Sequence, residues 1–251
     1  MSEQRVVLVT GAASGIGAAV CRRIAGPGAR LLITARHNRD GLETIAELAR
    51  DSGSEVAVEL GDLRDPDVPA RLIRAAIDAF GGLDQIVANA GFAQRGDLSE
   101  MDLEDLIQAQ HGMPEAFYSL ATAATPHLQN SDWGRIVATS SFVAHVYAAD
   151  GLFAATAAAK AATESLAKTL AVELAPSGVT VNSVAPGYTQ KDATGHSALS
   201  QDAWQKAIAK VPMGRIGIPG DAAALIAFLL SHDAAYITGQ TIHVDGGLTL
   251  A

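Results

Sequence analysis

The sequence predicts a single α/β domain in which helices flank a doubly wound parallel sheet of about seven strands. Short apolar runs of strand length alternate with longer segments whose apolar residues recur at helical spacing. The first run, Val6 to Val9, is continuously apolar, which is typical of a strand covered by helices on both faces. No linker, low-complexity tract or repeat divides the 251 residues, so we expect one continuous domain over residues 1–251.

Strands and helices are expected in regular alternation along the chain. A helix should begin at Gly15, directly after the first strand, and helical periodicity also marks Pro69–Phe80, Thr156–Ala175 and Asp221–Leu230. Polar motifs follow most of the strand ends, and ligands of such a sheet bind outside the carboxyl ends of its strands. The expected strands are Val6–Val9, Arg30–Thr34, Glu55–Leu60, Gln85–Ala88, Gly134–Thr139, Val179–Val184 and Gln240–Val244.

Charge and cysteine content narrow the class of partner. The formal net charge is −9, which opposes binding to nucleic acids or anionic membranes because phosphate contacts need a basic face. We therefore expect a small-molecule partner and no metal ion. The single cysteine, Cys21, falls in the apolar rhythm of the first helix, so we interpret it as a small core residue rather than a catalytic one.

The ends of the chain and its apolar runs predict the compartment. The first strand begins at Val6, close to Met1, which leaves no room for a secretion signal. The longest wholly apolar run, Ala222 to Leu230, is too short to cross a bilayer. We expect a soluble, cytoplasmic protein.

The turn after the first strand carries glycines at three spaced positions, Gly11, Gly15 and Gly17. Gly11 can adopt a backbone conformation closed to other residues, Gly15 lets a pyrophosphate approach the main chain, and Gly17 lets the helix pack close to the strand. Free backbone N–H groups then face an anion at the positive end of the helix, and we assign Ser14 and Ile16 to the same site. A strand before and a helix after favour a dinucleotide site over a plain turn.

The end of the second strand indicates which dinucleotide is bound. A site for NAD usually places an acid near this point to bind the ribose hydroxyls, whereas an arginine there accommodates the 2′-phosphate of NADP. The chain has no acid here and has Arg36, with Arg39 near enough to help. Because a guanidinium suits a phosphate, we favour NADP(H) over NAD(H); a solvated basic turn is the alternative.

The Thr-Gly-x-x-x-Gly-x-Gly turn resembles that of the short-chain dehydrogenase/reductase family, and later motifs match the same family in order and spacing over nearly the whole chain. The resemblance implies a Rossmann sheet that binds a nicotinamide dinucleotide. The later motifs are Gly61-Asp62-Leu63, Asn89-Ala90-Gly91, Asn182-Ser183-Val184-Ala185-Pro186-Gly187, Gly214-Arg215-Ile216-Gly217, Ile237-Thr238-Gly239-Gln240 and Val244-Asp245-Gly246-Gly247.

The same resemblance implies roles for individual residues. Asp62 would hydrogen-bond the adenine, with Leu63 beside it in the cofactor site. Asn89, Ala90 and Gly91 would line the cofactor floor and brace the sheet. Pro186 and Gly187 would complete the cofactor site, and a substrate lid would follow at about residues 188–211.

The family's reaction moves a hydride between the nicotinamide and a carbonyl carbon while a tyrosine passes the proton. By resemblance, Ser141 polarises the carbonyl, and Lys160 holds the ribose and lowers the pKa of the group four residues before it. That group is Thr156 where the family has its tyrosine. Thr156 lies one helical turn from Lys160 on the same face, but an aliphatic hydroxyl cannot hold appreciable negative charge near neutral pH.

Further departures surround this change. The family's helical asparagine aligns with Met113 or, at a shift of one, Gly112, and Lys191 stands where a threonine usually touches the nicotinamide. The spacing from Ser141 to Thr156 is two residues longer than usual in the family. Candidates for a replacement proton donor are Tyr147 and His145, both on the loop expected to rim the pocket; a plain pocket-wall or surface role is the alternative. Tyr188 and His111 are weaker candidates.

Three hypotheses for function remain open at this point. The first is an NADPH-dependent oxidoreductase that interconverts a small carbonyl compound and its alcohol, with an altered proton route. The second is a catalytically silent subunit that binds NADP(H), and the third is a non-redox lyase or dehydratase. The pocket loop, residues 142–153, and the lid contain no charge cluster that would select an acidic substrate. The small-residue helix at Thr156–Ala175 and the apolar helix at Asp221–Leu230 predict a homotetramer, as in the family.

Overall fold

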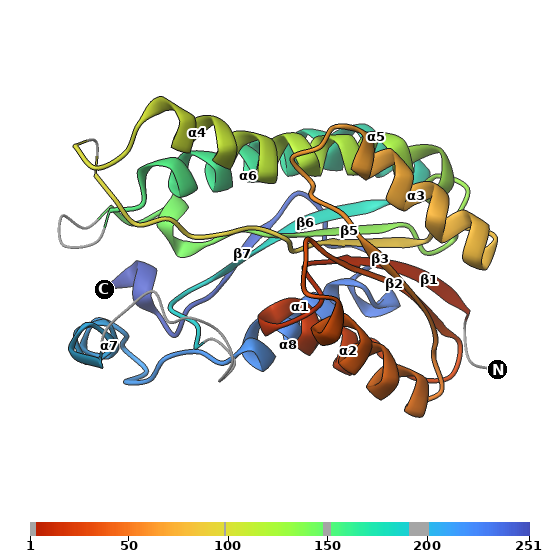
Figure 1. Ribbon diagram of the computed structural model, residues 1–251, viewed down its shortest axis with the longest axis horizontal. Coiled ribbons are helices and arrows are strands. Elements are labelled where there is room, and N and C mark those ends of the chain that lie inside the picture. Colours follow the sequence, from red (N-terminus) through yellow and green to blue (C-terminus); the bar gives the residue numbers. More distant parts are fainter. Residues whose placement is uncertain (1–3, 98, 148–151, 191–200) are drawn as a thin grey trace.

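A seven-stranded, wholly parallel sheet forms the centre of the molecule (Figure 1). The computed structural model describes residues 4–97, 99–147, 152–190 and 201–251. The strand order is β3-β2-β1-β4-β5-β6-β7. The strands are β1 (Arg5–Thr10), β2 (Ala29–Ala35), β3 (Glu55–Leu60), β4 (Gln85–Ala88), β5 (Arg135–Thr139), β6 (Thr180–Pro186) and β7 (Thr241–Val244).

Two layers of helices cover the sheet, one on each face (Figure 1). One layer contains α1 (Gly15–Ile24), α2 (Arg39–Asp51) and α8 (Pro219–Leu229). The other contains α3 (Asp67–Phe80), α5 (Ala116–Leu128) and α6 (Ala154–Leu174). The remaining helices are α4 (Leu103–Gln110), which packs on α6, and α7 (Gln201–Ala209).

The side chains of β1 show how one strand contributes to the hydrophobic cores on both faces of the sheet. Val6 and Leu8 belong to the core under α3, α5 and α6, whereas Val7 and Val9 belong to the core under α1, α2 and α8. Alternate residues of a strand point to opposite faces, so a continuously apolar strand can fill two cores at once. The prediction of a doubly wound parallel sheet is confirmed, with β3, β4 and α1 at their expected bounds and the other predicted elements within two residues of them.

Cys21 lies in the core, as expected. Cys21 is fully buried among the α1 side chains that pack on the sheet, and burial raises the pKa of its thiol to about 12. Its prediction as a core residue is confirmed. Among the described residues, no helix is both long and apolar enough to span a bilayer.

The strand order reverses between β1 and β4, and the side chain of Asn89 hydrogen-bonds to residues of the neighbouring strands at that point. Its amide donates hydrogen bonds to the carbonyl oxygens of Thr10 and Gly11, at 3.1 and 3.2 Å. Its side-chain oxygen accepts one from Thr139 Oγ1 at 3.2 Å. The carboxyl ends of β1, β4 and β5 are thereby tied to one residue at the position where such sheets bind their ligands.

We expect Gly17→Ala to lower the free energy of unfolding by about 1–3 kcal/mol, the usual range for an overpacked site. A Cβ at residue 17 would lie 2.2 Å from the carbonyl oxygen of Gly11 and 2.7 Å from the Asn89 amide nitrogen, so backbone would have to move.

Urea denaturation of both glycine-to-alanine variants measures this effect. The matched control is Gly220→Ala in α8, where the nearest atom to an added Cβ is the Ile218 side chain at 3.8 Å. The control should change stability by less than about 0.5 kcal/mol or raise it slightly. Equal losses in the two variants would contradict the close approach of α1 to the β1 turn.

Candidate active site

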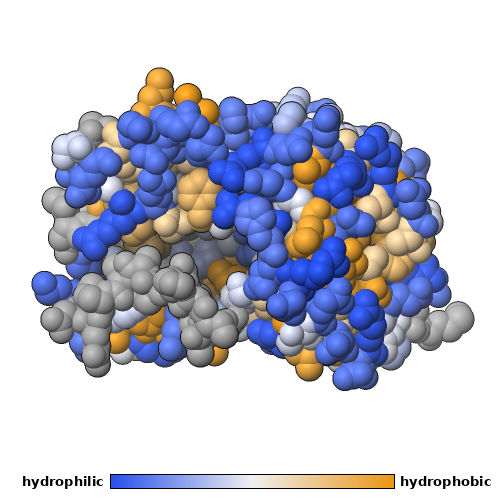
Figure 2. Space-filling model, in the orientation of Figure 1, coloured by the Kyte–Doolittle hydropathy of each residue, from blue (hydrophilic) through white to orange (hydrophobic). Residues whose placement is uncertain are grey.

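A cavity of about 960 Å³ opens at the carboxyl edge of the sheet, and Figure 2 shows the surface hollowed near its middle. Segments that follow β1 to β6 all contribute to its walls, as expected at the switch point of a doubly wound sheet. The cavity is lined by most of the residues predicted for the cofactor, namely Gly11, Ser14, Gly15, Ile16, Arg36, Asp62, Leu63, Asn89, Ala90, Gly91, Lys160, Pro186 and Gly187.

The glycine turn presents main chain to the cavity. Gly11 and Gly15 have φ angles of +65° and +57°, which L side chains rarely adopt, and a Cβ on Gly11 would lie 2.9 Å from Ala90 Cα. Ser14 precedes α1 without capping it through its side chain, and Ser14, Gly15 and Ile16 line the cavity, so the positive end of the helix dipole faces it. Gly17 does not line the cavity; it allows α1 to pack against Gly11, as predicted.

The two arginines after β2 have different surroundings. Arg36 is exposed and lines the cavity, whereas Arg39 begins α2 and forms an ion pair with Glu43 at 3.5 Å. Arg39 is not among the lining residues. Arg36 therefore faces the cavity, whereas Arg39 is directed along its own helix.

Asp62 is paired within the protein. The Arg64 guanidinium donates to both of its carboxylate oxygens, with Nη2 at 2.5 Å from Oδ2, and Nη1 donates to Gln108 of α4 at 2.8 Å. The hydrogen bond from Arg64 holds the pKa of Asp62 at about 2. This pairing offsets the negative charge of Asp62 in the part of the cavity nearest Arg36, and the sequence reasoning missed it.

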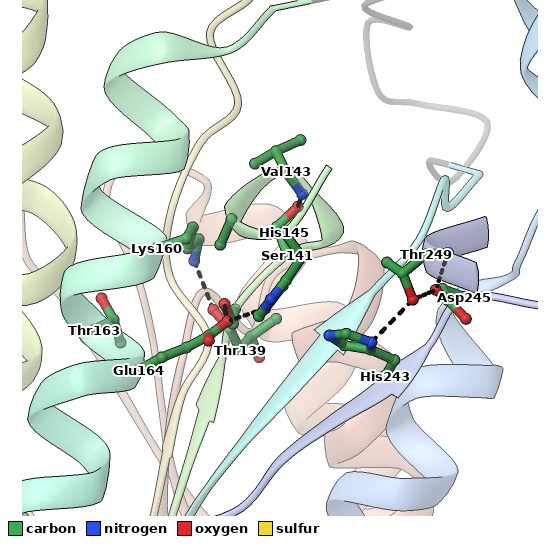
Figure 3. A network of polar contacts seen from close by, with 12 residues as sticks. Thr139, Ser141, Val143, His145, Lys160, Thr163, Glu164, His243, Asp245 and Thr249 are labelled. Carbon is green, nitrogen blue, oxygen red and sulfur yellow. Dashed lines mark hydrogen bonds and ion pairs between the residues drawn. The ribbon is translucent and has the colours of Figure 1, made fainter. Parts of the chain in front are cut away.

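Lys160 and Thr156 line the cavity from α6, one helical turn apart. The Lys160 ammonium is buried and donates to the carbonyl oxygen of Thr139 at 2.6 Å (Figure 3). Burial lowers the pKa of Lys160 to about 8, against the opposing attraction of the Glu164 carboxylate. A Cβ on Gly91 would lie only 3.2 Å from Lys160 Nζ, so the glycine leaves the ammonium room beside the cavity floor.

The two predicted hydroxyl groups also face the cavity. Thr156 is almost wholly buried, and its Oγ1 accepts a hydrogen bond from the Gln94 backbone at 3.0 Å. Ser141 follows β5, and its Oγ accepts from the Val143 backbone at 3.4 Å. Ser141, Thr156 and Lys160 are thus brought to one cavity as predicted.

Tyr147 does not join them. Its side chain is 68% exposed, its hydroxyl donates to the carbonyl oxygen of Ala144 at 2.9 Å, and it is not among the residues that line the cavity. The short helical turn at Phe142–Ala144 carries the chain outward before residue 147, so the prediction that Tyr147 lies at the pocket rim is wrong.

Tyr188 lines the cavity, whereas Lys191 and residues 192–200 of the expected lid lie outside the described residues.

The region predicted to lack the family's asparagine is irregular. A π-helical turn, His111–Glu115, joins α4 to α5 and contains Pro114. Gly112 lines the cavity, and Met113 is buried with its sulfur close to Gly91. Single π-helical turns between α-helical segments are frequent at functional sites. His111 forms an ion pair with Glu115 at 3.5 Å and does not line the cavity.

Glu164 is the other polar residue that the sequence reasoning missed. It lies on α6 one turn after Lys160, is buried, and accepts hydrogen bonds from Ser140 Oγ and from His145 Nε2, the latter at 2.9 Å (Figure 3). A carboxylate four residues beyond Lys160, on the face that carries Thr156, was the signal that could have revealed it.

Comparisons with known proteins agree with this fold. A family model described as enoyl-(acyl carrier protein) reductase matches residues 11–249. The 3-oxoacyl-[acyl-carrier-protein] reductases of Vibrio cholerae and Escherichia coli are 36% and 35% identical over 246 residues, which cover 98% of this chain and of each relative. A short-chain type dehydrogenase/reductase from Mycobacterium marinum superposes with a TM-score of 0.92 at 31% identity, covering 99% of this chain and 97% of that one.

A second solved structure, a Serratia marcescens short-chain dehydrogenase/reductase mutant, has a TM-score of 0.90 at 30% identity, with 98% of both chains covered. Sequence and structure agree over nearly the full length, and the cavity lies at the same switch point that the glycine turn predicted. The chain therefore belongs to the short-chain dehydrogenase/reductase family of oxidoreductases.

Proposed function

We propose that the protein is an NADPH-dependent reductase that converts a small, uncharged ketone to its alcohol, with Lys160 as the proton donor where the family has its tyrosine. The observation that carries the proposal is the buried Lys160 ammonium, which shares one cavity with the glycine turn, Ser141 and Thr156. The reverse oxidation uses the same groups.

The residues present fit a nicotinamide dinucleotide. The N-terminus of α1, whose dipole favours an anion, suits a pyrophosphate. The exposed Arg36 suits a 2′-phosphate, because the nearby Asp62 carboxylate is paired with Arg64. Gly91 leaves space in front of Lys160 for a ribose. The cavity volume of about 960 Å³ accommodates a dinucleotide with a small partner. When bound, NADPH would supply the hydride.

The proton is the harder requirement for this chain. The hydroxyl of Thr156 cannot replace a phenol as an acid, because an aliphatic alcohol does not ionise near neutral pH. The Lys160 ammonium has a pKa of about 8 and is therefore a stronger acid than an unperturbed phenol, whose pKa is near 10. Ser141 and Thr156 remain as hydroxyl groups that hydrogen-bond and orient the carbonyl oxygen.

The walls of the cavity support an uncharged substrate with an aromatic or other apolar group. The chain has six Phe, four Tyr and two Trp residues, and five of them line the cavity. They are Phe92, Phe142, Phe153, Tyr188 and Trp204, and the rings of Phe142 and Tyr188 lie 4.6 Å apart. Apart from Lys160, the acidic, arginine and lysine side chains among the described lining residues come from the segments after β2 and β3.

The same experiment tests a second candidate substrate and a second hypothesis for the function. The relatives named 3-oxoacyl-[acyl-carrier-protein] reductases make a 3-oxoacyl thioester a second candidate substrate, because an acyl chain would also fit apolar walls. A silent NADPH-binding subunit is the alternative from another class, and Thr156 in place of a tyrosine favours it.

Assembly and location remain predictions of the sequence. Val172 of α6 is 79% exposed and Phe228 of α8 is 41% exposed, so both helices offer apolar side chains to a second copy. This supports the homotetramer that the family resemblance predicts. A cytoplasmic location is likewise carried only by the sequence.

Stopped-flow absorbance at the nicotinamide band tests the proposed function. The wild-type protein, mixed with NADPH and an aryl alkyl ketone, a small aliphatic ketone, an α-keto acid or a 3-oxoacyl thioester, should bleach NADPH fastest with the aryl ketone. The α-keto acid should be the poorest, since its carboxylate would enter the aromatic wall unpaired. If NADPH binds but none of the four bleaches it, the silent subunit becomes the better account.

Arg36→Ala should weaken NADPH binding about tenfold and leave NADH binding unchanged. Loss of a charge-assisted hydrogen bond costs about 1.5–3 kcal/mol, and we take the low end because Arg36 is exposed and screened by solvent. Fluorescence titration of both cofactors measures the change. The matched control, Arg39→Ala, should bind both cofactors as the wild type does, because Arg39 pairs with Glu43. Equal affinities of the wild type for NADPH and NADH would contradict the assignment.

The reductive rate should be constant below about pH 8 and fall tenfold per pH unit above it. The reason is that the donor must carry its proton, and Lys160 loses it near pH 8. Lys160→Met should reduce the rate about 10²–10⁴-fold and remove this dependence. Initial rates at saturating NADPH from pH 6 to 10 provide the test, with Lys168→Met, an exposed position on the same helix, as the control. A Lys160→Met variant with the wild-type profile would exclude Lys160 as the donor.

A further inference from the structure

Glu164 is a buried carboxylate that the proposed reaction leaves without a role. Only 6% of its side chain is exposed, and it contacts two groups, Ser140 Oγ and His145 Nε2. The same oxygen, Oε1, accepts both hydrogen bonds. An ionisable group is costly to bury without charged or hydrogen-bonded partners, so these contacts explain how the carboxylate is tolerated but not why a carboxylate is there.

The order of the three groups excludes one familiar arrangement. In a Ser-His-acid triad the imidazole stands between the hydroxyl and the carboxylate, and it takes the proton from the serine. Here the carboxylate stands between the hydroxyl and the imidazole. The hydroxyl of Ser140 therefore donates to Glu164 and not to the imidazole of His145. Ser140 is therefore not activated as a nucleophile.

The same order does connect the cavity with solvent. Ser140 lines the cavity directly after Thr139, whose carbonyl oxygen accepts from Lys160. His145 is 30% exposed and does not line the cavity. Ser140, Glu164 and His145 thus form a continuous line of hydrogen bonds from the cavity wall to a solvent-accessible imidazole. Figure 3 shows the contact between Glu164 and His145.

Among the residues that the structure describes, the charged and titratable groups that contact His145 come from α6 and β7. Glu164 accepts from its Nε2, and the ring of His243 on β7 meets its edge with centroids 4.5 Å apart. His243 in turn shares a hydrogen bond with Thr249, which also donates to Asp245 at 2.7 Å (Figure 3). An imidazole has two ring nitrogens, so it can take up a proton at one and release a proton from the other.

We propose that Ser140, Glu164 and His145 form a proton relay that reloads Lys160 from solvent after each turnover; this rests on the proposed function. In the reduction, the carbonyl carbon takes a hydride from NADPH and the oxygen takes a proton from Lys160, which leaves a neutral amine. One proton must then return. His145 takes it from water at Nδ1, which leaves hydroxide in solution, and releases the proton already on Nε2 to Glu164. Glu164 protonates Ser140 Oγ as Ser140 turns its own hydroxyl proton into the cavity, toward the Lys160 amine.

The relay is needed for every turnover after the first, because the first uses the proton that Lys160 already carries. The variant His145→Gln tests this requirement. A glutamine amide can still donate a hydrogen bond to Glu164 but cannot take up and release a proton. In a weakly buffered solution, with a ketone that the wild type reduces, the variant should complete its first turnover at the wild-type rate because Lys160 is already protonated. Later turnovers should be at least about tenfold slower, with KM unchanged. Millimolar imidazole should restore most of the rate.

Two further variants control this experiment. His127→Gln, on α5 and not among the residues that line the cavity, should show neither the burst nor the imidazole effect. Glu164→Gln should also slow the later turnovers, but imidazole should not restore them. Since the Glu164 carboxylate favours the charged form of Lys160, its loss should move the high-pH limb of the rate below pH 8.

The outcomes are distinct. If the wild type bleaches NADPH and His145→Gln matches it in all turnovers without imidazole, the relay is wrong while the proposed function stands. A variant that is slow already in its first turnover, and that imidazole does not rescue, shows a structural role and also overturns the relay. A wild type that reduces no ketone overturns the proposed function itself.

Discussion

The hydrogen bonds of Asn89 are the constraint on which the site depends. This one side chain bonds to the main chain at Thr10 and Gly11 and to the hydroxyl of Thr139, so the carboxyl ends of β1, β4 and β5 are held at fixed distances. In addition, the hydroxyl oxygen of Thr10 accepts hydrogen bonds from the backbone N–H groups of Asn89 and Ala90. The cavity floor and the carbonyl oxygen that receives Lys160 are both attached to this junction.

Most of the fold could be predicted because its signals are local. Continuously apolar runs such as Val6 to Val9 identify buried parallel strands, and Gly11 and Gly17 are needed wherever the backbone turns or approaches closely. The dinucleotide side of the cavity follows from the same signals. Its residues come directly after strand ends, and the parallel sheet brings strand ends to one edge regardless of the side chains between them.

The chemical side of the cavity was harder to predict because it depends on loop paths and on pairings across the sequence. Nothing near Tyr147 in the sequence shows that its loop turns outward at Phe142–Ala144. The contact of Glu164 with His145 joins α6 to the segment after β5, and their mutual orientation is set by the folded backbone. Thr156 and Lys160 could be placed, since four residues along one helix fix their relation in advance.

The part of the cavity formed by the glycine turn after β1, here called the cradle, presents mostly main chain. The proton-handling groups beside it are side chains on α6 and after β5. A cradle built from peptide groups survives many substitutions, because every residue carries the same N–H and carbonyl groups. The reactive side chains have no such redundancy, and each can be exchanged by a single codon change while the cradle goes on binding. The architecture therefore allows reaction chemistry to diverge among descendants of one gene faster than cofactor binding does.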